Sequence, residues 1–233
     1  MDGASGRTRA DDGANFFGLK FEGLKSLKGI KTFNPQTFSN PQTSNHFKLS
    51  NQMQRIAIDM DDVLADATGR FLEYLDQRAG VQVTRQQLWG RDWADVTDIH
   101  RSTIRSWVYE AGFFRDMALL PDAQEVVQKL QERYEVFIVS AAMEFPLSLK
   151  EKLDWMAEHF PFVDWRYIVF CGHKYMIKAD YLIDDHEKNL VSFEGTSLLF
   201  SAPHNAHLTG YTRVNTWREV EQLLLPKSAE VVI

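Results

Sequence analysis

The sequence predicts an α/β fold, in which a Rossmann-like parallel sheet carries helices on both faces and a small helical cap is inserted after the first strand. Short apolar runs, typical of strands buried on both faces, alternate with longer stretches of helical periodicity. Strands that alternate with helices in this way indicate a parallel sheet with right-handed crossovers. The aromatic-rich residues 81–117 interrupt the alternation and thereby indicate the cap.

The first strand and the cap are predicted from local patterns. Residues 56–58 form an apolar run followed directly by aspartates. A helix then follows that Gly80 ends, because glycine readily adopts the left-handed conformation that terminates helices. Inside the cap, Thr97 or Asp98 is expected to cap a helix that continues to Ala111.

After the cap the sequence returns to alternating strands and helices. The helical periodicity of residues 147–159 places Leu149, Leu153 and Met156 on one face, which we expect to be buried. Further strands are expected at residues 136–139, 167–170, 181–183 and 197–200, and further helices at residues 122–130 and 217–225.

The chain divides into three predicted regions. Residues 53–68 and 118–228 are expected to form the core domain, and residues 69–117 the cap. Residues 1–52 are rich in Gly, Ser, Asn, Thr and Lys and show no strand or long-helix pattern, so they are expected to be largely disordered. Met53 lies just before the first strand, and one hypothesis is that the native protein starts there.

Composition narrows the class of protein. The chain has 233 residues, of which 44% are hydrophobic and 25% charged, as is typical of a globular enzyme-sized domain. A net charge of -6 argues against a partner that is a nucleic acid polymer, whereas small phosphorylated substrates need only a local cationic pocket. Because Cys171 is the single cysteine, no intramolecular disulfide can form, which fits a reducing, cytoplasmic compartment. No apolar run of about 18 residues is present, so no membrane span is expected.

Three aspartates follow the first strand within four residues, namely Asp59, Asp61 and Asp62. Carboxylates at the carboxyl end of a parallel strand lie where α/β sheets bind ligands. They repel one another, so the cluster costs stability unless a cation offsets the charge, and Mg²⁺ is a hard cation that takes oxygen ligands. The alternative is an ordinary aspartate-rich turn, since Asp also favours turns and helix N-caps.

Other polar groups follow later apolar segments. Ser140, Lys174 and the pair Asp184 and Asp185 each come after an expected strand or close to one. Taken singly, such a serine is usually a helix cap, such a lysine a solvated charge, and such an aspartate pair a turn. Because the carboxyl ends of parallel strands meet at one edge of a sheet, the groups are expected to converge there.

In this order the motifs resemble those of the haloacid dehalogenase-like phosphatases. More narrowly, the chain resembles the 5'(3')-deoxyribonucleotidases, or cytosolic type C nucleotidases, from about Met53 to Leu225. The resemblance is carried by the four motifs, residues 59–63, 137–140, 174 and 182–185, and by residues 112–116, 173–174 and 203–208.

The resemblance implies a mechanism and roles for single residues. Asp59 is expected to be the nucleophile and Asp61 the general acid and base. Mg²⁺ is expected to bind a carboxylate oxygen of Asp59, the backbone carbonyl of Asp61, and motif four, with Asp185 as the direct ligand and Asp184 in support. Ser140 and Lys174 are expected to bind the phosphate. Relatives in this family can dimerise, so a homodimer is a further expectation.

The substrate pocket is expected in the cap. Phe71, Trp89, Trp93 and Trp107 are the candidates to stack on a nucleobase, although for each of them core packing is the ordinary alternative. Related mammalian enzymes often carry arginine after motif four, where this chain has His186, which is therefore assigned to the pocket. His204 and His207 are expected to belong to a structural loop, because no carboxylate partner accompanies them in the sequence.

The expected reaction is hydrolysis of (deoxy)ribonucleoside monophosphates through an aspartyl-phosphate. One alternative keeps the same residues but acts on another small phosphoester, for example a sugar phosphate. The other alternative is a non-catalytic binding module on the same fold, which would have no need of an acid/base group at Asp61.

Overall fold

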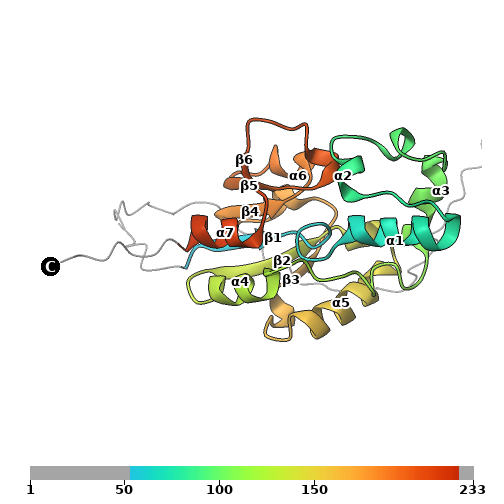
Figure 1. Cartoon of the computed structure of the whole chain (residues 1–233). Coiled ribbons are helices and arrows are strands. Elements are labelled where there is room, and N and C mark those ends of the chain that lie inside the picture. The colour runs from blue at the N-terminus through green and yellow to red at the C-terminus, as the bar shows by residue number, and fades with distance from the viewer. Residues whose placement is uncertain (1–52, 226–233) are drawn as a thin grey trace, which may run out of the picture. The chain divides into compact units, whose positions relative to one another are not determined.

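A computed structural model describes residues 53–225 of the chain (Figure 1). Residues 1–52, for which disorder is expected, and residues 226–228 of the predicted core lie outside the described residues. The hypothesis that the native protein starts at Met53 also concerns the residues before this range. None of the helices in the described range has the length and apolar character that a membrane crossing requires.

Within residues 53–225, six parallel strands form one sheet in the order β3-β2-β1-β4-β5-β6. β1 is central, and Ala57 pairs with Phe137 on one side and Leu182 on the other. The sheet order reverses between β1 and β4, which is the switch point where α/β sheets bind ligands. The strands are β1 (Arg55–Ile58), β2 (Glu135–Ser140), β3 (Ile168–Phe170), β4 (Tyr181–Asp184), β5 (Thr196–Phe200) and β6 (Thr212–Val214).

Helices cover both faces of this sheet, which confirms the predicted fold class. Because successive side chains of a strand point to opposite faces, Ile56 and Ile58 share a core with Val126 of α4, while Ala57 packs with Leu190 of α6 on the other face. The helices are α1 (Ala67–Ala79), α2 (Arg85–Leu88), α3 (Arg101–Ser106), α4 (Ala123–Leu130), α5 (Ser148–His159), α6 (Glu187–Leu190) and α7 (Trp217–Leu224).

The segment that holds α1, α2 and α3 leaves the core and returns to it at a single place. The N–H of Asp66 donates to the carbonyl of Ala118 at 2.8 Å, and Ala65 forms an antiparallel bridge with Leu119. These contacts bring together the stretch of chain that leaves the core and the stretch that returns to it. The segment lies at the carboxyl-terminal end of the strands (Figure 1). The segment is therefore placed over the edge of the sheet that carries the aspartates.

The ends of α1 show why the chain turns into a helix after the aspartates. The carboxylate of Asp66 accepts from the N–H of Gly69 at 2.7 Å and so satisfies a free donor of the first turn. Asp62 accepts from both the N–H and the hydroxyl of Thr68 at 2.8 and 2.7 Å. Gly80 ends α1 with a φ of 62°, the left-handed conformation expected for it.

Two local predictions differ from the structure. The predicted helix in the cap is shorter, because His100 caps it and α3 gives way to a 3-10 turn at Trp107. Thr97 instead accepts from the N–H of Ile99 within a turn. β6 was not predicted, since its three residues are too few to show an alternating pattern.

The predicted buried face of α5 was correct for Met156 and wrong for Leu153. Leu153 is exposed, whereas Ser148, Lys152, Trp155 and Met156 are buried. The burial of Lys152 is the physical reason, because its ammonium finds charged and polar partners inside the protein. Hydrophobic periodicity treats lysine as exposed to solvent, so it predicts a buried face for α5 that differs from the observed one.

Glu151, also on α5, connects this helix to the loop where the inserted segment returns. Its carboxylate accepts from the N–H groups of Gly112, Phe114 and Arg115 at 2.6, 3.1 and 3.2 Å. Three backbone donors of the loop are thus satisfied by one charged acceptor. The loop contains Phe113 and Phe114, both buried in the core.

We expect Glu151→Ala to lower the free energy of unfolding by about 3 kcal/mol, since hydrogen bonds to charged groups contribute roughly 1.5–3 kcal/mol each and do not add fully. Urea unfolding followed by circular dichroism measures the change. Glu158→Ala is the matched control, because it removes an exposed ion pair to Arg115 from the same helix. An equal midpoint for both variants would contradict the role given to Glu151.

Candidate active site

Lys174 lies among the carboxylates at the switch point of the sheet. Its Nζ is 2.6 Å from Oδ1 of Asp59 and 2.7 Å from Oδ2 of Asp184, and all three side chains are buried. Burial alone would raise the pKa of Asp59, but the ammonium of Lys174 holds it below its ordinary value. Burial opposes the charge of Lys174, yet the two carboxylates raise its pKa. Asp59 is therefore an ionised carboxylate held by a permanent cation.

Asp184 is fixed by donors on either side of it. The side-chain amide of Asn189 lies 3.0 Å from each carboxylate oxygen, and the N–H of His186 donates at 2.8 Å. Burial and the nearby charge of Asp59 raise the pKa of Asp184. The carboxylate is thus rigid and supports Lys174 from the side opposite Asp59.

Asp185 is buried beside this group but has fewer compensating partners. Its Oδ1 has no hydrogen-bond partner among the described residues. The side-chain amide of Asn205 donates to its backbone carbonyl at 2.8 Å. Burial and the charges of Asp59 and Asp184 raise the pKa of Asp185 well above its ordinary value. A buried carboxylate in this condition requires a further cation to remain ionised.

A second lysine holds the other motif-one aspartate. Lys152 comes from α5, and its Nζ lies 2.5 Å from Oδ2 of Asp61 and 2.9 Å from the hydroxyl of Ser140. The same ammonium lies 4.6 Å from the centre of the Phe114 ring, a cation–π distance. Sequence reasoning missed Lys152, since a lysine within a helix carries no signal that distinguishes it from a surface charge. Only its place on the buried face of α5 reveals it.

The donor set fits a hard divalent cation. Asp59, Asp184 and Asp185 each present an oxygen within 4.8 Å of the others, and all three are buried. The unpartnered Oδ1 of Asp185 supplies a free acceptor in the same place. Oxygen-only sets of this kind suit Mg²⁺.

A cavity of about 400 Å³ opens between these aspartates and the inserted segment. This volume lies within the usual range for small-molecule sites. Three of the residues predicted for the pocket line it, namely Phe71, Trp93 and His186. The rings of Phe71 and Trp93 lie 5.7 Å apart.

The two other tryptophans predicted for the pocket do not line this cavity. Trp107 is 5% exposed and packs against Tyr74 in the core of the inserted segment. Trp89 is 42% exposed and lies next to Gly90, whose N–H donates to the carbonyl of Pro203 at 2.9 Å. The sequence pattern of aromatic residues could not distinguish these packing positions from lining positions.

Basic side chains that sequence reasoning did not single out also line the cavity: Arg91, Arg101, Arg105 and Lys188. Arg101 and Arg105 are ion-paired with Asp92 and Glu144. Because they line the same cavity as the aspartates, these cations favour an anionic ligand. Ser140, by contrast, is buried beneath Lys152 and is not among the lining residues.

The chain is similar to several known proteins. A family model, "5' nucleotidase, deoxy (Pyrimidine), cytosolic type C protein", matches residues 52–230. A provisionally named 5'(3')-deoxyribonucleotidase of Staphylococcus epidermidis is 44% identical over 168 residues, which cover 72% of this chain and 94% of that protein. The 5'(3')-deoxyribonucleotidase of Bacillus subtilis is 39% identical over 170 residues, covering 73% of this chain and 98% of that protein. A haloacid dehalogenase-like hydrolase structure from Streptococcus pneumoniae has a TM-score of 0.48 at 14% identity and covers 73% of this chain and 98% of that chain.

We expect Asp185→Asn to raise the thermal unfolding midpoint in the presence of a chelator at neutral pH. The pKa of Asp185 is raised in the folded chain. The stability contributed by this group is therefore complete below its ordinary pKa of about 3.8 and is lost as the pH rises toward the folded value. The difference between variant and wild type should accordingly grow from pH 4 to pH 8, as differential scanning calorimetry measures.

Asp76→Asn is the control, because Asp76 is exposed on α1 and its replacement should leave the midpoint unchanged at each pH. Added Mg²⁺ should raise the midpoint of the wild type and leave that of Asp185→Asn nearly unchanged, since only the intact cluster binds the ion. A variant that is less stable than the wild type at pH 8 without metal would contradict the charge crowding described here.

Proposed function

The chain belongs to the cytosolic type C 5' nucleotidase family, a 5'(3')-deoxyribonucleotidase-like group of phosphatases, and we propose that it is a Mg²⁺-dependent hydrolase of (deoxy)ribonucleoside monophosphates that acts through an aspartyl-phosphate. The observation that carries the proposal is the two lysine–aspartate ion pairs at the switch point. Lys174 holds Asp59 and Lys152 holds Asp61, and both aspartates line one cavity. Two aspartates held by different lysines suit a nucleophile and an acid/base group.

Asp59 is the proposed nucleophile. A carboxylate oxygen attacks phosphorus while the bond from phosphorus to the nucleoside oxygen breaks, and Asp61 gives its proton to that oxygen. Water then attacks the aspartyl-phosphate, Asp61 takes the proton of the water, and phosphate leaves with Asp59 restored. Lys174 is well placed to hold Asp59 ionised between these steps.

The residues proposed to hold Mg²⁺ are Asp59, Asp185 and the backbone carbonyl of Asp61, with Asp184 in support. When bound, the ion offsets the negative charge of the phosphate and of the carboxylates. The free Oδ1 of Asp185 supports this assignment.

Lys152 is proposed to position Asp61 for proton transfer, with the hydroxyl of Ser140 as the second partner of its ammonium. Its ammonium lies between the two, so it fixes the direction of both side chains at once. The remaining oxygen of Asp61, Oδ1, is buried and has no partner among the described residues. That oxygen is the one we assign to proton transfer, because Lys152 already occupies the other.

The inserted segment, residues 69–117, is proposed as a cap that carries the nucleoside side of the pocket. Phe71 and Trp93 line the cavity and are the residues assigned to stacking on the base, a contact that contributes roughly 1–3 kcal/mol. A cap over the cavity also excludes water from the reacting groups.

We further propose that the protein acts in deoxyribonucleotide catabolism. A cytoplasmic location is supported by its single cysteine, Cys171, which suits a reducing compartment. The expected homodimer stays a prediction, which sedimentation equilibrium checks.

We expect the wild type with Mg²⁺ to release phosphate from deoxyribonucleoside monophosphates with a higher kcat/KM than from sugar phosphates. Asp59→Asn should reduce turnover of every substrate to background and remain folded, because the amide is isosteric but not nucleophilic. A panel that compares both substrate classes by phosphate release tests the proposal. A preference for sugar phosphates would overturn the substrate class, and turnover by Asp59→Asn near the wild-type rate would overturn the nucleophile.

Lys152→Met should lower kcat/KM for a nucleoside monophosphate by roughly 10²-fold, since general acid catalysis by a positioned group contributes about 10²–10⁴-fold. An aryl phosphate, whose leaving group needs no proton, should lose much less. Lys150→Met is the matched control, because Lys150 is exposed on the same helix and pairs with Asp154. Equal losses of kcat/KM with both substrates would show that Lys152 supports the site as a whole and does not act specifically through the proton donor Asp61.

A further inference from the structure

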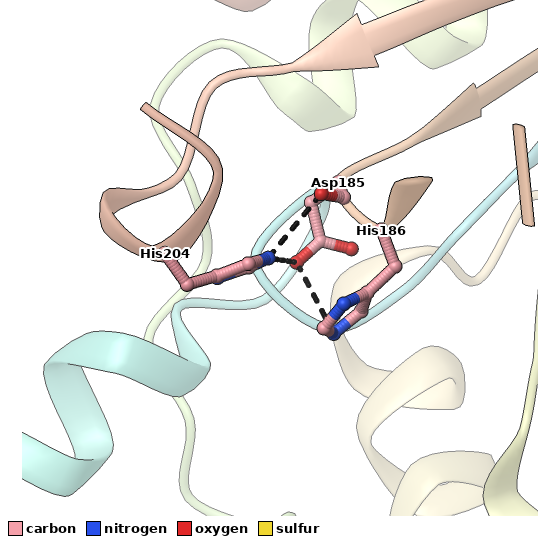
Figure 2. A group of neighbouring side chains, drawn as sticks. All are labelled: Asp185, His186 and His204. Atoms are coloured by element: carbon pink, nitrogen blue, oxygen red, sulfur yellow. Dashed lines mark hydrogen bonds and ion pairs between the residues drawn. The ribbon is translucent and has the colours of Figure 1, made fainter. Parts of the chain in front are cut away.

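Two imidazoles and one carboxylate converge beside the proposed magnesium site. Nε2 of His204 lies 3.3 Å from Oδ2 of Asp185, and Nε2 of His186 lies 3.8 Å from the same oxygen. The ligand atoms of the three side chains all lie within 4.8 Å of one another. Figure 2 shows Nε2 of His204 directed at this oxygen and at the backbone carbonyl of Asp185, 3.2 Å away, while the His186 ring approaches the same carboxylate oxygen from another side.

The three groups are held by separate elements of the fold. His186 directly follows Asp185 at the end of β4, whereas His204 lies in the 3-10 turn Pro203–Asn205. The side-chain amide of Asn205 in that turn donates to the carbonyl of Asp185, just after β4, at 2.8 Å. It also donates to the carbonyl of Phe200 in β5 at 2.8 Å. The rings of the two histidines stack with their centres 4.5 Å apart. The arrangement is therefore built into the fold and does not depend on a flexible loop end.

The chemistry of these donors differs from that of the neighbouring carboxylates. Asp59, Asp184 and Asp185 offer only oxygen, which suits a hard cation, whereas imidazole nitrogen suits Zn²⁺ and other first-row transition metals. Two imidazoles and a carboxylate, with further positions open to water, form a donor set typical of bound zinc. Asp185 belongs to both sets.

We propose that Asp185, His186 and His204 form a second, transition-metal site of the Zn²⁺ and Co²⁺ class, and that its occupation inhibits the enzyme by drawing Asp185 away from the Mg²⁺ site. The inhibition rests on the function proposed above, whereas the binding of the metal does not. Both rings also line the cavity, so a metal held there lies next to the phosphate position.

Metal binding is tested on the full chain without reference to turnover. Co²⁺ is titrated at a fixed, moderate Mg²⁺ concentration while the visible absorption of the protein is recorded, and bound Zn²⁺ is counted by equilibrium dialysis. Because both ions use Asp185, raising the Mg²⁺ concentration should weaken the binding of Co²⁺ and Zn²⁺. The wild type should gain one bound ion and an absorption band of imidazole-ligated, low-coordinate Co²⁺. The double variant His186→Ala, His204→Ala should lose both signals.

His207→Ala is the matched control, because His207 lies on the same loop, is exposed, and is not among the three converging residues. It should bind Co²⁺ and Zn²⁺ as the wild type does. If the wild type binds no more Co²⁺ or Zn²⁺ than the double variant, the proposed site is wrong. The histidines are then only hydrogen-bond partners of Asp185.

The inhibitory consequence is measured in the same three proteins. Zn²⁺ at fixed Mg²⁺ should lower phosphate release by the wild type and by His207→Ala, and should affect the double variant much less relative to its own activity without zinc. Zinc bound at the two histidines without any loss of turnover would overturn the coupling through Asp185. A chain that binds the metal yet hydrolyses no phosphoester would refute the proposed function and leave the binding site standing.

Discussion

Negative charge concentrated at one edge of a parallel sheet is the constraint on which the rest of this structure depends. Asp59 and Asp61 follow β1, and Asp184 and Asp185 lie at the end of β4, on the other side of the switch point. Like charges so close repel one another. Two buried lysines offset part of this repulsion, with Lys174 between Asp59 and Asp184 and Lys152 beside Asp61. Asp185 remains without such a partner, and its raised pKa reflects this. This unbalanced negative charge favours the proposed Mg²⁺ ion at the site.

The fold brings the offsetting charges from elements far apart in the sequence. Lys174 follows β3 at the edge of the sheet, while Lys152 reaches in from the buried face of α5. The same helix uses Glu151 to hold the loop where the inserted segment returns to the core. One helix thus links the placement of Asp61, the proposed acid/base group, to the placement of the segment that lines the cavity.

How far the sequence predicts this site depends on where each residue lies in the chain. Asp59, Ser140, Asp184 and Asp185 could be predicted because strand ends converge at one edge of a sheet. Lys152 could not, because helical periodicity treats a lysine as solvent-facing and no strand end marks it. Trp107 was predicted to be a pocket residue because the sequence does not distinguish aromatic residues that pack in the core from those that line the cavity. His204 was assigned to a structural loop, yet the fold supplies, in Asp185, the carboxylate that its neighbours in sequence lack.

The central claim is that Asp59 carries the phosphoryl group. Borohydride reduces an aspartyl-phosphate to homoserine, so quenching the enzyme during turnover of a nucleoside monophosphate and sequencing its peptides by mass spectrometry locates the modified residue. Homoserine is expected at position 59, and only when substrate and Mg²⁺ are both supplied. Modification of a different aspartate under the same conditions, or steady turnover with no modified aspartate, would contradict it.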